Sequence, residues 1–169
     1  MSHLDAVLQT EDFARDVLSG ALATAAGDES VEEQVAARLG RQYLLRQKPQ
    51  PEVRVIVDEF AFRRPAAQGE TWQDQLRHLE AAALWPNVTL QVLPFSAGAH
   101  HHMSGSLTLL WQREGGAVAY TEGNSKGWLF EDPDEVLRER LSYDRLRDLA
   151  LSPPDSLAFI RDLLEERGP

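Results

Sequence analysis

Apolar side chains recur in the first part of the chain at the spacing of amphipathic helices. Thr10 can cap a helix that opens with two acidic residues, which the positive end of a helix dipole favours. Ser30 and Glu33 have the spacing of a capping box, and apolar residues follow at helical intervals until Pro49. We therefore predict two helices, one that ends near Leu22 and one that begins after Ser30.

The middle of the chain changes to the two-residue alternation that is typical of β-strands. Val53, Val55 and Val57 alternate with other residues, and a third helical pattern covers residues 71–85. Four further segments have strand character, namely residues 88–92, 107–111, 117–122 and 128–130. Short turns between neighbouring strands favour antiparallel pairing.

Two helix starts follow the strands. Asp132 precedes Pro133, and Ser152 precedes Pro153, so each pair places a capping side chain before a proline at the first helical position. The sequence thus predicts an α+β fold in which a small antiparallel sheet is flanked by N-terminal and C-terminal helices. We expect one domain over residues 1–169, without a DNA-binding domain.

Charge and composition narrow the range of functions. Of the 169 residues, 43% are hydrophobic and 26% are charged, as in ordinary globular domains. The formal net charge of −10 opposes direct contact with nucleic acid, because phosphate contacts need a basic face. Disulfides and cysteine-bound zinc are excluded because the chain has no cysteine. We find no signal peptide and no apolar run of the ~20 residues that span a bilayer, so we expect a cytoplasmic protein without membrane contact.

His100, His101 and His102 form a histidine cluster. Histidine is a common metal ligand and titrates near neutral pH. Adjacent positions in an extended chain point in alternate directions, so three consecutive histidines do not readily surround one ion. We favour a polar loop over a metal site, and among the three we predict that His100 contacts a ligand, because nearby glycines permit a tight loop over a pocket.

Arg63 and several aromatic residues are the other candidates for ligand binding. Arg63 could hold a carboxylate or phosphate, although pairing with Asp58 or Glu59 is the simpler expectation. Trp111, Tyr120 and Trp128 could line an apolar pocket for a planar small molecule, although aromatic side chains of this kind are more often core residues. No catalytic residue is assigned, and no metal or cofactor is expected, since none of the familiar nucleotide-binding or hydrolase motifs occurs.

The segments "LQTEDFARDVL", "VIVDEFAFRRP", "LFEDPDEV" and "YDRLRDLALSPPDSLAFIR" follow one another between about Leu8 and Leu164. In this order they resemble a sensor-like domain of unknown function in actinobacterial transcription regulators, which are Xre-type, antitoxin-like proteins of the Scr kind. In those regulators a helix-turn-helix precedes the domain and contacts DNA, while the domain itself is thought to sense a signal or contact a partner. The resemblance implies a sensor-like domain that stands here without the helix-turn-helix.

Two main functions remain open from the sequence. The first is a regulator-derived domain, free-standing and without direct DNA contact, that binds a small hydrophobic ligand or a small basic partner protein. A homodimer is one form that such a domain could take. The alternative is an enzyme of specialised metabolism, of the cyclase or isomerase type, that uses the sensor pocket for a hydrophobic substrate. A metal-dependent hydrolase built on His100 to His102 is the weakest of the possibilities.

Overall fold

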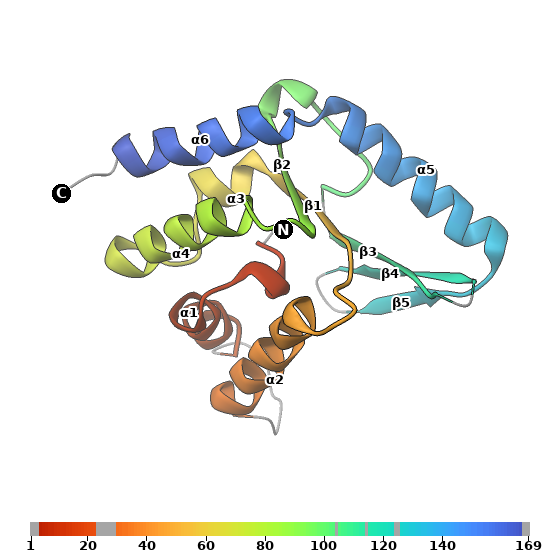
Figure 1. The fold of residues 1–169 in the computed structure, drawn as a ribbon, viewed down its shortest axis with the longest axis horizontal. Coiled ribbons are helices and arrows are strands. Elements are labelled where there is room, and N and C mark those ends of the chain that lie inside the picture. The colour runs from red at the N-terminus through yellow and green to blue at the C-terminus, as the bar shows by residue number, and fades with distance from the viewer. Residues whose placement is uncertain (1–3, 23–29, 104, 114, 124–125, 167–169) are drawn as a thin grey trace.

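The computed structural model describes residues 4–22, 30–103, 105–113, 115–123 and 126–166. Within these residues the chain forms six α-helices and two small sheets (Figure 1). The helices are α1 (Glu11–Leu22), α2 (Val31–Tyr43), α3 (Glu59–Arg63), α4 (Gly69–Ala82), α5 (Pro133–Leu149) and α6 (Pro153–Glu166). The strands are β1 (Val53–Asp58), β2 (Val88–Leu93), β3 (Ser106–Trp111), β4 (Ala117–Glu122) and β5 (Gly127–Phe130). The predicted α+β class, with helices at the start and end of the order, is confirmed.

Local capping explains where several of these helices begin. The hydroxyl of Ser30 accepts from the backbone N–H of Glu33, and the Glu33 side chain accepts from the backbone N–H of Ser30, which is the predicted capping box of α2. Asp132 accepts from two backbone N–H groups in the first turn of α5. None of the helices in the described ranges is long and apolar enough to cross a membrane.

β1 and β2 pair in parallel, in contrast to the antiparallel sheet that the sequence predicts. Their register runs from Val53 opposite Val88 to Asp58 opposite Leu93. The chain between the two strands contains α3 and α4. This helical connection returns the chain to the end of the sheet at which β1 began, so that β2 runs in the same direction. A connection of this length permits parallel strands, whereas a tight turn would require antiparallel ones.

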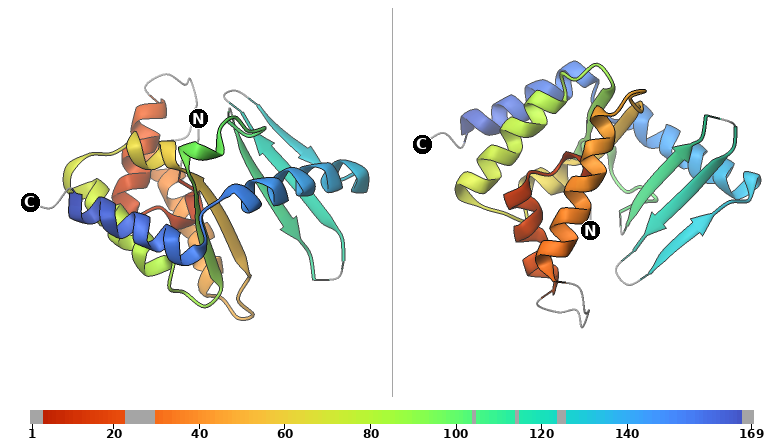
Figure 2. Two further views of the ribbon diagram at one scale, coloured as in Figure 1. Left: turned by 90° about the horizontal axis from the view of Figure 1, so that it is seen from above. Right: turned by 60° about the horizontal axis from the view of Figure 1, so that its bottom comes forward.

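The later strands follow the prediction. β3, β4 and β5 form an antiparallel sheet in this order, and α5 packs on one of its faces over the buried residue Ala119. Figure 2 shows this sheet with α5 beside a larger helical part, in which α1, α2, α4 and α6 lie on the side of the parallel pair that faces away from the antiparallel sheet. The molecule therefore has two packed parts that meet along β1, β2 and α5.

The main core fills the helical part and includes both parallel strands. Its buried side chains include Phe13, Val55, Val57, Phe62, Trp72, Leu76, Leu79, Leu90, Val92, Ile160 and Leu163. The outer edge of β2 is closed by the start of α6, because the backbone N–H of Val92 donates to the buried hydroxyl of Ser156 at 2.9 Å. The Val92 carbonyl accepts from the backbone N–H of Leu151 at 2.8 Å, so this strand edge is not open for pairing.

Candidate ligand-binding cleft between the two sheets

A cavity of about 140 Å³ lies where β1, the loop after β2, the start of β3 and α5 meet. Its walls combine charged, histidine, tyrosine and aliphatic residues, namely Asp5, Arg54, Val55, Ile56, Val57, Asp58, Leu93, His100, His102, Gly105, Ser106, Leu107, Tyr143 and Leu146. Asp58 and Leu93 are the last residues of the parallel strands, and this is the end of a parallel sheet at which open α/β folds bind ligands. Pockets for drug-sized molecules measure roughly 300–1,000 Å³, so this cleft fits a small molecule or one end of a larger one.

The most buried polar contact in the cleft joins His100 to Asp58. Asp58 ends β1 and caps α3, where one carboxylate oxygen accepts from the backbone N–H of Phe60 at 2.7 Å. The other oxygen lies 3.0 Å from Nε2 of His100, whose side chain is only 7% exposed. This contact assigns the proton of the neutral imidazole to Nε2 and leaves Nδ1 as an acceptor. Nδ1 of His100 is buried and has no hydrogen-bond partner.

His102 contacts the opposite wall of the cleft. Its Nε2 lies 2.9 Å from the hydroxyl of Ser142 and 3.8 Å from the carboxylate of Glu139, both on α5. Burial lowers the pKa of His102, and the charges of His101 and His100 act in the same direction, while the Glu139 charge opposes them. The ring is therefore neutral at neutral pH. Oε2 of Glu139 is buried without a hydrogen bond, but Glu139 does not line the cleft, where α5 contributes Tyr143 and Leu146.

Tyr143 and Arg54 supply the remaining polar groups. Burial raises the pKa of the Tyr143 phenol, an effect that the positive charges of Arg54 and Arg147 partly offset. At neutral pH the Tyr143 hydroxyl therefore keeps its proton and can donate a hydrogen bond. Arg54 lies on β1 with an exposed side chain, and its guanidinium offers several donors to an anionic group.

The histidine segment does not form a metal centre in the part of the chain that the structure describes. There, no group of at least three histidine, aspartate or glutamate side chains is arranged to hold a metal ion. His100 and His102 are largely buried, whereas His101 between them is exposed. Because of this alternation the two buried rings contact different elements, His100 the end of β1 and His102 the helix α5.

Arg63 lies outside the cleft. It is on α3, where its guanidinium pairs with Glu59 at 3.1 Å and with Glu166 of α6 at 3.6 Å. It also lies over the ring of Phe159, with 5.5 Å between the guanidinium carbon and the ring centre. Arg63 thus joins α3 to α6, and a ligand role for it stays a prediction.

The three predicted aromatic residues lie on the antiparallel sheet and do not line the cleft. Trp111 and Trp128 are 55% and 53% exposed, and the guanidinium of Arg140 from α5 lies 5.2 Å from the Trp111 ring centre. Tyr120 projects from the other face of the sheet and covers Gly127 of β5. Of the five side chains predicted to bind a ligand, the structure places only His100 in the cleft. Homodimer formation also stays a prediction.

The sequence pattern does not identify the contribution of α5 to the site. Val136, Glu139, Tyr143 and Leu146 share the side of α5 that packs toward the sheets, because they recur at helical spacing. Most residues of α5 are polar or charged, as in a helix on the protein surface, so two more polar residues do not stand out in the sequence. The one sign of a site is that Glu139 and Tyr143 lie on the side of α5 that is otherwise apolar.

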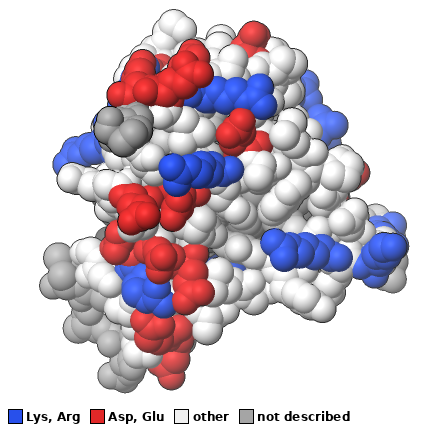
Figure 3. All heavy atoms as spheres, turned by 60° about the vertical axis from the view of Figure 1, so that its left-hand side comes forward, with Lys and Arg blue, Asp and Glu red and all other residues white. Residues whose placement is uncertain are grey.

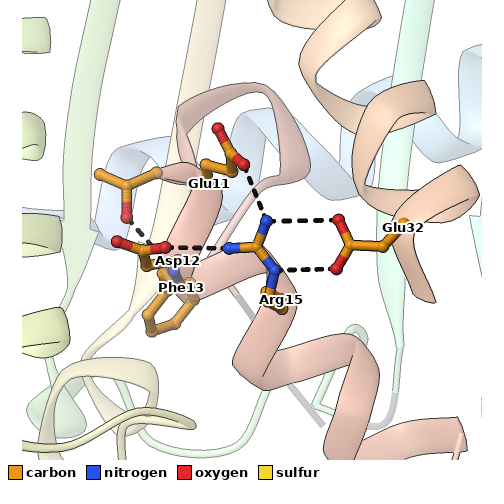
Figure 4. Close-up of polar contacts among 6 residues, drawn as sticks. Glu11, Asp12, Phe13, Arg15 and Glu32 are labelled. Carbon is orange, nitrogen blue, oxygen red and sulfur yellow. Dashed lines mark hydrogen bonds and ion pairs between the residues drawn. The ribbon is translucent and has the colours of Figure 1, made fainter.

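Acidic side chains gather along the side of the molecule formed by α1, α4 and α6, with basic side chains between them (Figure 3). In one such group, the guanidinium of Arg15 lies among the carboxylates of Glu11, Asp12 and Glu32, at 2.8, 2.9 and 3.0 Å (Figure 4). The hydrogen bonds that Arg15 donates to the carboxylates of Glu32 and Glu11 raise its pKa above the ordinary range. The contact with Glu32 joins α1 to α2, whereas the contacts with Glu11 and Asp12 lie within α1.

Residues 1–162 match the family described as a domain of unknown function, DUF5753. The chain belongs to this family. No curated protein and no solved structure matches it. The DUF5753 match covers the whole cleft, including the histidine segment and α5, and its description assigns no function.

Proposed function

We propose that this DUF5753 domain is a non-catalytic recognition domain of the sensor type, without direct DNA contact, and that the cleft binds a small polar ligand. The observation that carries the proposal is His100, whose buried ring is fixed by Asp58 at Nε2 and has no partner at Nδ1. A buried polar atom without a hydrogen bond costs about 1–3 kcal/mol, and a ligand that donates to Nδ1 would recover this energy.

The other wall residues define the chemistry of the ligand. The Tyr143 hydroxyl and the Arg54 guanidinium are donors, so they favour an acceptor or anionic group on the ligand. His100 Nδ1 favours an N–H or O–H group. A small molecule with both kinds of group fits the cleft better than an entirely hydrophobic one.

The histidine segment also offers a route by which binding would reach the rest of the domain. His100 contacts the end of β1, and His102 contacts α5, so one short segment joins the helical part to the antiparallel sheet. A ligand that shifts this segment would change how the two parts pack. Such a change is what a sensor needs in order to alter a surface that a partner protein reads.

The proposal is tested by untargeted mass spectrometry of small molecules released from natively purified protein. We expect wild-type protein to retain a defined compound, His100→Asn to lose it, and His101→Asn, a matched change at the exposed neighbouring ring, to keep it. Thermal unfolding of each variant checks that the domain is folded. Absence of any retained compound, or equal retention by His100→Asn, would falsify the proposal.

The Asp58–His100 pair favours one second candidate, an enzyme of the cyclase or isomerase type. A carboxylate that orients an imidazole leaves the other ring nitrogen free to act as a general base. If wild-type protein converts the retained compound to an isomer, and His100→Asn binds the compound without converting it, the domain is an enzyme of this type.

A further inference from the structure

A second cavity, of about 170 Å³, lies at the opposite end of the parallel strands from the cleft. It is lined by Val7, Leu39, Gln42, Tyr43, Leu45, Arg46 and Trp85, and we refer to it as the α2–α4 groove. Leu45 precedes β1 and Trp85 precedes β2, so the groove lies beside the starts of both strands. It shares no wall residue with the cleft.

The groove combines apolar and polar wall residues and has a single cationic group. Arg46 supplies the charge, and its guanidinium carbon lies 5.9 Å from the centre of the Trp85 ring. Among the residues that the structure describes, no carboxylate forms an ion pair with Arg46. The side-chain amide of Gln42 already donates to the backbone carbonyls of Ala6 and Gln9. Arg46 is therefore the group that remains available to a charged ligand.

Trp85 also packs against α4. His78 of α4 packs edge-on against the indole with 5.7 Å between ring centres, and its Nε2 is buried without a hydrogen-bond partner. Burial and the nearby charge of Arg46 both lower the pKa of His78. The imidazole is thus neutral at neutral pH, and Arg46 is the cation that a ligand would meet.

The groove exposes one large wall residue with an apolar ring. Tyr43 lines the groove and is 64% exposed, although α2 otherwise turns apolar residues such as Val35 toward the core. Exposed apolar groups gathered around a concave surface are typical of binding sites. A cavity of roughly 150 Å³ accepts a benzene molecule, so the α2–α4 groove has room for one ring.

We propose that the α2–α4 groove binds a small carboxylic acid with an aromatic or aliphatic body. The body would pack against Trp85 and Leu45, and the carboxylate would pair with Arg46, whose planar guanidinium matches a carboxylate. An arginine without an ion pair, beside the apolar side chains of Leu45 and Trp85, is complementary to an anionic ligand with an apolar body. This site goes beyond the polar cleft and does not depend on it.

The test uses phenylacetate, with the neutral phenylacetamide as the matched probe. In NMR titrations of the full chain, we expect phenylacetate to shift the Trp85 indole N–H signal saturably and phenylacetamide to bind about tenfold more weakly, as expected for loss of a charge-assisted hydrogen bond. Arg46→Gln should remove the preference for the acid, whereas Arg41→Gln, an exposed arginine of α2 outside the groove, should leave it unchanged. His100→Asn should also leave it unchanged, which separates this site from the cleft.

The outcomes against the proposal are equally specific. Equal binding of acid and amide would remove the role of Arg46, and shifts confined to Trp111 or Trp128 would place the ligand on the antiparallel sheet. Absence of a saturable shift at millimolar phenylacetate would overturn the site. A peptide that ends in phenylalanine with a free carboxylate, but not free phenylacetate, would show that the groove recognises a chain terminus and contradict a small-molecule ligand.

Discussion

The buried side chain of Gln75 accepts a hydrogen bond from the backbone N–H of Thr10 at 2.7 Å. Its amide nitrogen donates to the backbone carbonyl of Leu8 at 2.8 Å. A single glutamine of α4 thereby satisfies two backbone groups at the start of α1. These groups lie where the chain changes from the short helix η1 (Ala6–Leu8) to α1, so no regular helix bond is available to them.

Replacing Gln75 with leucine should reduce the free energy of unfolding by about 2–4 kcal/mol, because a buried and a part-buried backbone group lose their partners. Urea unfolding followed by tryptophan fluorescence measures this loss. Gln68→Leu is the matched control, since Gln68 is exposed at the start of α4 and makes no capping hydrogen bond. Equal stability of the two variants would contradict the structural role of Gln75.

Gly105 approaches the backbone of β4 more closely than a side chain permits. A Cβ atom at Gly105 would lie 2.5 Å from the carbonyl oxygen of Glu122. Gly105→Ala should therefore push β3 away from β4 and destabilise the domain by about 1–3 kcal/mol. Thermal unfolding compares it with Gly127→Ala, in which the added methyl group meets the ring of Tyr120.

Gly127→Ala should be the milder change. Tyr120 is 37% exposed, so its ring can rotate toward solvent, whereas a backbone carbonyl in a paired strand cannot move alone. A larger loss of stability for Gly127→Ala than for Gly105→Ala would show that Tyr120 is fixed and that the strands are not.

The sequence predicts local structure better than long-range contacts, and the capping residues show why. Ser30 and Asp132 act on backbone groups within three residues, so their effect can be read from the sequence. The parallel pairing of β1 with β2 depends on packing across α3 and α4, and no short motif encodes it. The antiparallel pairing of β3 to β5 is local and was predictable from turns.

The candidate site follows the same rule. The alternation of exposed and buried rings in the histidine segment follows from neighbouring positions. The contact between His100 and Asp58 joins residues 42 positions apart, and the contact between His102 and Ser142 joins residues 40 apart. Only the fold brings these groups together, so sequence alone could select His100 but could not name its partners.

The ion pair between Arg15 and Glu32 should contribute more to stability than an ion pair within one helix. Nε and one terminal nitrogen of Arg15 contact the two oxygens of Glu32 at 3.0 and 3.3 Å, and this paired contact joins α1 to α2. Arg15→Gln should therefore lower the unfolding midpoint more than Arg77→Gln, whose ion pair with Asp74 lies within α4. Added salt should reduce the difference, because screening weakens exposed pairs. A difference that does not depend on salt would assign the effect to packing.

The stability of the domain should fall as the pH drops below about 6.5, the ordinary histidine pKa, because the folded state resists protonation of His78 and His102. Burial lowers the pKa of both rings, so the unfolded chain binds protons first and is favoured in acid. The loss begins near the unfolded pKa and ends at the lowered pKa values of the folded state.

His102→Gln should make the decline between about pH 7.5 and pH 5.5 shallower, since it removes one of the two groups, although Glu139 beside the ring partly opposes the effect. His101→Gln removes an exposed ring that contributes only a minor part of the lowering at His102, so it should change the decline less than His102→Gln does. Urea midpoints across this range measure the slopes, and an unchanged slope in His102→Gln would mean that the ring accepts its proton as readily in the folded state as in the unfolded chain.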